Sequence, residues 1–193
     1  MNRALTLGVI GALLAFVLMY GCNKRNSFVE LNENVKSQWQ QVESQYQRRA
    51  DLIPNIVSTV KGQANFEKET LEGVIAARAK ATQVTIDPSN LNESNMEQFK
   101  KVQGEVSSAL SRLLAISENY PDLKTNQGFS DLRVQLEGCE NRISEERRKY
   151  NEAVKTFNAS IKKIPGNLFA WGYKDAAYFE AEAGTEKAPK VEF

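Results

Sequence analysis

The stretch that decides the fold runs from Gln38 to Val57 and reads QWQQVESQYQRRADLIPNIV. Its apolar residues recur at steps of three and four, which places them on one face of a helix. The same face continues in both directions and comprises Phe28, Leu31, Val35, Trp39, Val42, Tyr46, Ala50, Ile53, Val57, Val60 and Ala64. The steps follow an eleven-residue recurrence, which favours a nearly straight helix in a bundle over a left-handed coiled coil.

Pro54 lies inside this stripe and affects the helix that the stripe predicts. Proline has no backbone N–H, and its ring crowds the carbonyl four residues earlier, which here belongs to Ala50. We therefore expect a helix kink at Pro54, near Ala50 to Ile53.

Further helical stripes follow. Asn26 or Ser27 is expected to cap the first bundle helix and Thr125 or Asn126 the last one, while residues 84–94 have the composition of a connecting loop. The apolar faces comprise Leu71, Val74, Ile75 and Ala79, then Met96, Phe99, Val102, Val106, Leu110, Leu113 and Ser117, and finally Phe129, Leu132, Leu136, Cys139, Ile143, Tyr150, Val154, Phe157 and Ile161.

These stripes predict an all-α fold, an elongated antiparallel bundle of three to four long helices behind one N-terminal transmembrane helix. Helices of about 30 to 40 residues span roughly 45 to 60 Å, so the bundle should be a rod. We divide the chain into an anchor (residues 1–25), a helical bundle (26–163) and an aromatic, acidic C-terminal tail (164–193).

The segment from Ala4 to Cys22 is apolar apart from Thr6. As a helix of about 19 residues it spans roughly 28 Å, close to the hydrocarbon thickness of a bilayer. A cleavable signal peptide has a shorter apolar core, so we expect an uncleaved, single-pass anchor in a bacterial inner membrane. A buried helix of a soluble protein is a further alternative.

Gly21 and Cys22 support the alternative that the segment is a lipoprotein signal, because Gly-Cys is the centre of a lipobox. Cys22 would then be acylated, and the protein would be an envelope lipoprotein. The sidedness of the bundle also stays open. Lys24 and Arg25 outnumber Arg3, which favours a cytoplasmic bundle, whereas acylation would place it outside the membrane.

Four segments resemble the signature of the LemA family of bacterial membrane-anchored helical proteins. They read QWxQVxxxYQRRADLIPN, KGxAxxEKETLxxVxxAR, LSRLLAISENYPDLK and YFEAEAGxEKAPKVEF. The resemblance covers nearly the whole chain after the anchor. It implies a helical bundle tethered by one transmembrane helix, and it implies no particular biochemical activity.

The composition argues against several kinds of function. The chain has 25 basic and 24 acidic residues, a balance that does not attract nucleic acid. It has no histidine, the commonest general base and metal ligand. Its two cysteines, Cys22 and Cys139, cannot form a metal site between them. We expect no cofactor, no metal and no enzymatic activity.

Polar residues interrupt the apolar faces of the first and last bundle helices. Arg49 and Arg147 lie at the seam, and a buried guanidinium needs carboxylates and further acceptors. The candidate polar network comprises Arg48, Arg49, Asp51, Glu140, Asn141, Arg147, Tyr150 and Asn151. We expect it to fix helix register, and the alternative is a receptor that binds a small acidic ligand between helices through Arg49 and Arg147.

The tail offers the second candidate site, with Tyr178, Phe179, Val191 and Phe193 as partner-binding residues. Its aromatic residues can fold back on the bundle or lie in the bilayer interface. The spacing of Val191 and Phe193 instead fits strand addition to a PDZ-type domain, which several membrane proteases carry.

These features together predict a membrane-anchored, non-enzymatic scaffold or adaptor. It would present a helical rod and a C-terminal tail for protein interaction or self-assembly. The expected partners are the lipid bilayer, further copies of the chain, and a membrane protein such as a membrane protease or another PDZ-bearing protein.

Overall fold

The computed structural model describes residues 3–62 and 66–179, with side chains from residue 7 onward. Its helices are α1 (Arg3–Lys61), α2 (Lys68–Gln83), α3 (Glu93–Ser117), the short α4 (Pro121–Lys124) and α5 (Gln127–Lys162), followed by the 3-10 turn η1 (Gly166–Phe169). These described ranges contain no strand. The predicted all-α fold is therefore confirmed.

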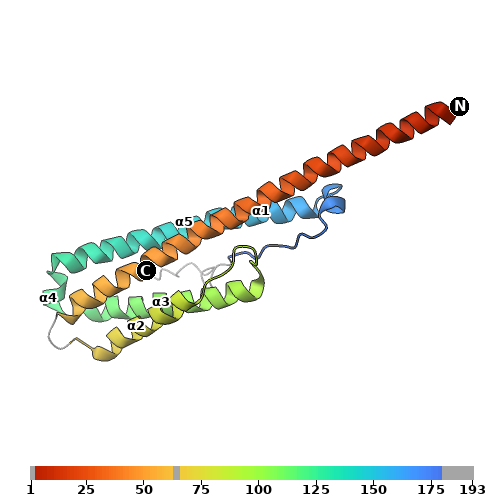
Figure 1. Cartoon of the computed structure of the whole chain (residues 1–193). Coiled ribbons are helices and arrows are strands. Elements are labelled where there is room, and N and C mark those ends of the chain that lie inside the picture. The colour runs from red at the N-terminus through yellow and green to blue at the C-terminus, as the bar shows by residue number, and fades with distance from the viewer. Residues whose placement is uncertain (1–2, 63–65, 180–193) are drawn as a thin grey trace, which may run out of the picture.

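The bundle is elongated and is built along α1 (Figure 1). Helix α5 runs back along α1 in the opposite direction, and α2 and α3 form a hairpin on the other side of α1. The N-terminal part of α1 projects alone beyond the bundle. At about 1.5 Å per residue, the 59 residues of α1 reach about 88 Å.

Two adjoining apolar clusters form the core. In the half nearer the projecting end, Trp39 of α1 packs edge-on against Phe99 of α3 and Tyr150 of α5. In the other half, Ile53 and Val60 of α1 lie in one cluster with residues of α2, α3 and α5. Both clusters include members of the stripe read from Gln38 to Val57, which supplies one side of the whole core.

The expected cap at Asn26 or Ser27 is wrong, because α1 continues without a break from the apolar segment into the bundle. Residues 22–28 contain no proline or glycine, and the preference of asparagine or serine for a cap is worth only about 1 kcal/mol. Burial of Phe28 and Val35 on one continuous face outweighs it. At the last helix the prediction holds, since Asn126 caps α5 and accepts a hydrogen bond from the Phe129 amide at 3.0 Å.

The apolar face expected for α2 is partly wrong. Leu71 and Val74 are buried, but Ile75 is 44% exposed and Ala79 is exposed. Steps of four residues drift off the face of a helix with 3.6 residues per turn. The buried face continues instead through Ala77 and Ala81.

Helix α1 passes through Pro54 as one helix. Proline cannot donate to the Ala50 carbonyl, so this carbonyl lacks its usual partner within α1. Arg78 of α2 supplies the missing donor, with its Nε 2.8 Å from the Ala50 oxygen. The proline thus creates a docking point for α2 on α1.

Candidate functional site

The most elaborate polar arrangement holds the beginning of the C-terminal tail against the bundle. After η1 the chain turns back and runs in an extended conformation over residues 174–179. It contacts α1, α3 and α5 along the way: Ala177 donates its amide to the Leu91 carbonyl just before α3, at 3.1 Å. Phe179 is buried between the three helices.

Two asparagines of α5 hold this segment by its main chain. The Asn158 side chain accepts from the Ala176 amide and donates to the Ala176 carbonyl, both at 2.9 Å. Asn151 makes the same pair of bonds with Phe179, both at 2.8 Å. We call Asn151 and Asn158 the asparagine clamp.

The clamp matches the geometry of an extended peptide. Seven residues of α5 separate the asparagines, which is about 10 Å along a helix. Three residues of extended chain, from Ala176 to Phe179, also cover about 10 Å. Each asparagine side chain therefore replaces a neighbouring strand, pairing with both the N–H and the C=O of one residue.

Tyr150 adds a bond between the two clamp positions. Its hydroxyl donates to the Ala177 carbonyl at 2.8 Å, and its side chain is fully buried. Burial raises the pKa of the Tyr150 phenol, which therefore stays protonated as a hydrogen-bond donor.

Phe179, the last described residue of the segment, packs against an aromatic ring and an arginine guanidinium. Its ring is stacked with Tyr46, with centroids 6.3 Å apart. The Arg147 guanidinium lies over the Phe179 ring at 4.1 Å from its centroid, and the Arg49 guanidinium lies over the Tyr46 ring at 4.9 Å. Cation–π attraction favours both placements.

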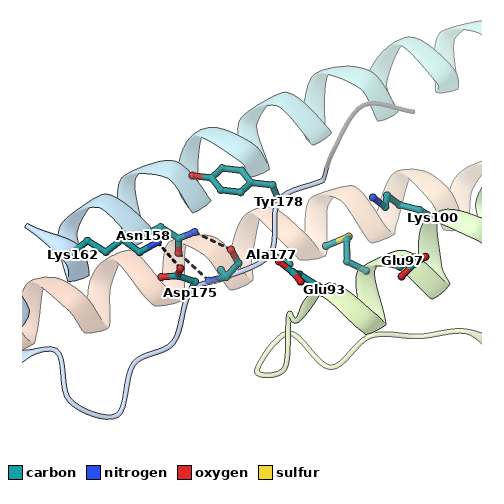
Figure 2. Close-up of a pocket in the computed structure, with 10 residues that line it drawn as sticks. Glu93, Glu97, Lys100, Asn158, Lys162, Asp175, Ala177 and Tyr178 are labelled. Atoms are coloured by element: carbon teal, nitrogen blue, oxygen red, sulfur yellow. Dashed lines mark hydrogen bonds and ion pairs between the residues drawn. The ribbon is translucent and has the colours of Figure 1, made fainter. Parts of the chain in front are cut away.

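A hollow of about 490 Å³ flanks the clamped segment (Figure 2). Its lining combines acidic and basic side chains from α3, α5 and the tail, among them Glu93, Glu97, Lys100, Lys162 and Asp175. Lys162 pairs with Asp175 at one side of the hollow, close to Asn158. The mixed charges make this hollow unlike the mostly apolar pockets that bind small molecules.

Arg49 forms a second polar cluster in the core. Its guanidinium donates to Glu140 at 2.9 Å and to Ser107 at 2.8 Å. It also donates to the side chain of Gln103 at 2.7 Å and to the Gln103 carbonyl at 3.1 Å. Because these partners come from α3 and α5, Arg49 ties α1 to both helices and fixes their register.

The predicted network is thus divided in the structure. Arg49 and Glu140 come together, whereas Tyr150 and Asn151 bind the tail. Asp51 accepts from Gln47 on the surface of α1, and Arg48 and Asn141 are exposed. Arg49 lies over the Tyr46 ring and Arg147 over the Phe179 ring, so each of the two arginines has an aromatic partner.

Sequence reasoning missed Asn158 and Arg78. Asn158 lies seven residues after Asn151 on the same face of α5, a spacing that could have signalled the pair. No local pattern marks Arg78, since its partner is a carbonyl freed by a proline on another helix.

The remaining candidates occupy separate places. Cys22 is exposed on α1, and Cys139 is buried, where desolvation and the neighbouring Glu140 raise the pKa of its thiol. Tyr178 is 42% exposed beside the buried Phe179. Val191 and Phe193 lie outside the described residues.

Among the residues that are described, no group of three or more Cys, Asp or Glu side chains could hold a metal ion.

One helix in the described part of the chain, α1, is long and apolar enough to cross a membrane. Its apolar side chains from Leu7 to Met19 are exposed, between 49% and 69%. A helix that is apolar on every side and uncovered by protein is typical of a membrane segment.

Comparison with known proteins identifies relatives over most of the chain. The model of the LemA family matches residues 38–193. Magnetosome protein MamQ 1 of Paramagnetospirillum magneticum is 27% identical over 190 residues, covering 88% of this chain and 68% of that protein. Protein LemA of Metamycoplasma hominis is 22% identical over 164 residues, covering 82% of this chain and 71% of that protein.

Proposed function

Since the chain belongs to the LemA family and is a membrane-associated protein, we propose that it is a single-pass scaffold of the bacterial inner membrane. It carries out no chemistry of its own in this proposal. It presents its helical rod and its C-terminal tail to a second copy or to another membrane protein, of which a PDZ-bearing membrane protease engaging Val191 and Phe193 is one class.

The observation that carries the proposal is the continuity of α1. One helix supplies both the apolar segment and the central element of the bundle, with no loop between them. The orientation of the rod relative to the anchor is therefore set by a helix rather than by a flexible linker. A fixed orientation suits a protein that positions partners at a membrane.

The internal polar clusters support a structural role. Arg49, the one arginine buried in the core of the described residues, already donates four hydrogen bonds to protein groups. The asparagine clamp and Tyr150 are likewise committed to the main chain of the tail. These groups hold the bundle and its tail in place.

Photo-crosslinking in intact membranes tests the proposal. A photoreactive residue is introduced in the full chain at Val134 of α5, at Ile75 of α2 or at Tyr178, which are 65%, 44% and 42% exposed. The fully buried Trp39 serves as the matched control position. We expect an adduct with a second copy or with another membrane protein from at least one exposed position and none from Trp39. Absence of intermolecular adducts from all three exposed positions would overturn the scaffold role.

A further inference from the structure

The end of the bundle nearest the anchor exposes large apolar side chains on the loop after α5. Ile164 is 84% exposed, and Leu168 and Trp171 are each 72% exposed. We call residues 163–173 the anchor-side loop. In Figure 1 this loop, drawn in blue, lies where α1 leaves the bundle.

The loop is fastened to α1 at the end of the apolar segment. Phe169 packs edge-on against Tyr20, with ring centroids 6.0 Å apart. It also covers Gly21, where an added Cβ would lie 2.6 Å from the Phe169 ring, so a larger residue there would displace the ring. The height of the loop along α1 is therefore fixed at Tyr20 and Gly21.

A cation from α1 also holds Trp171 in place. The Arg25 guanidinium lies over the indole ring at 4.1 Å and donates to the Trp171 carbonyl at 3.4 Å. The ring nevertheless remains largely uncovered. Trp171 is thus oriented by the protein while much of its surface contacts no protein group.

The charge around the loop has one sign. Residues 20–27 and 160–173 contain Lys24, Arg25, Lys162 and Lys163 and no acidic side chain. Asp175 pairs with Lys162 just beyond this region. Basic residues beside exposed tryptophan and leucine are the composition of a segment that binds a bilayer surface with anionic lipids.

We propose that the anchor-side loop docks on the same bilayer that α1 crosses. Leu168, Trp171 and Ile164 enter the interface, and Lys24 and Lys163 lie at the level of the lipid phosphates. A bilayer fits this surface because the exposed apolar side chains of the loop adjoin those of α1, whose apolar segment ends at the same height. The inference rests on the membrane anchoring proposed above, to which it adds a second point of attachment.

Tryptophan fluorescence tests this docking because the chain has two tryptophans in contrasting places. Trp39→Phe leaves Trp171 as the reporter, and Trp171→Phe leaves the buried Trp39 as the matched control. The indole Nε1 of Trp39 has no hydrogen-bond partner among the described residues, so phenylalanine there removes no such bond. Helix content and thermal unfolding establish that both variants fold.

The full chain is reconstituted in vesicles of phosphatidylcholine and phosphatidylglycerol that carry bromine either near the top or near the centre of the acyl chains. Trp171 should be quenched more strongly by the shallow bromines than by the deep ones, and it should be shielded from aqueous iodide. Trp39 should respond to neither. Leu168→Asp should reduce the shallow quenching of Trp171, whereas Val134→Asp, at an exposed position distant from the loop, should leave it unchanged.

Vesicle flotation separates the two proposals. A protein that fails to float with the lipid contradicts the anchoring itself. A protein that floats while Trp171 is open to iodide and insensitive to bromine overturns the docking of the loop alone. Shielding from iodide without bromine quenching would also overturn it and would indicate a protein partner on the loop.

Discussion

At the scale of single residues, the tail depends on side chains that bind its main chain. Asn151→Ala should expose two unpaired backbone groups of Phe179 and destabilise the protein by about 1 to 3 kcal/mol, since each hydrogen bond contributes about 0.5 to 1.5 kcal/mol. Urea unfolding measures the loss, and hydrogen exchange at residues 176–179 locates it. Asn141→Ala, at an exposed asparagine of the same helix, is the control and should change stability little.

A second residue-scale prediction concerns Glu43, whose pKa is raised by desolvation. A raised pKa means that the folded state disfavours the charged carboxylate, so stability is lost as the pH rises through the folded-state pKa. Glu43→Gln should therefore raise the melting temperature at pH 7 and change it little below about pH 4. Thermal unfolding across this range measures the difference.

Glu145 provides a comparison, because its pKa is shifted in the opposite direction to that of Glu43. Its hydrogen bond to Arg148 lowers its pKa, so it contributes stability at neutral pH that disappears as the pH falls through the lowered value. Glu145→Gln should lower the melting temperature at pH 7, by a small amount because the pair is exposed. If the two variants showed pH profiles in the same direction, one of the two assignments would be wrong.

At the scale of elements, the contact between α1 and α2 depends on a proline. Arg78→Met should cost about 1 to 3 kcal/mol because it leaves the Ala50 carbonyl without a donor. In a Pro54→Ala background the amide of residue 54 can bond to that carbonyl, so the same change should cost less. A double-mutant cycle by urea unfolding measures the coupling, and equal costs in both backgrounds would refute it.

Helix type and core faces could be predicted because they follow from short-range periodicity. Trp39, Val106 and Ile143 are buried where the stripes placed them. The break expected at Asn26 failed, since a local cap preference competes with the burial of a long continuous face. The separation of the network could not be predicted either: Arg147 lies on the apolar stripe of α5 because Phe179, far away in sequence, covers it.

At the scale of the whole molecule, the contacts of Tyr20 and Gly21 favour an uncleaved anchor. Cleavage before Cys22 would remove both residues and with them the packing of Phe169 on α1. We expect mass spectrometry of the protein purified from membranes to find residues 1–22 attached and Cys22 without an acyl group. A mature form that begins with acylated Cys22 would show that the lipoprotein alternative is correct.

The asparagine clamp has a consequence for distances from the membrane. Phe179 is held opposite Tyr46, and α1 rises about 36 Å between Cys22 and Tyr46. A partner recruited by the residues after Phe179, as proposed above, would therefore be tethered partway along α1 instead of at the end of its apolar segment. The clamp therefore sets the height along α1 at which the residues after Phe179 begin.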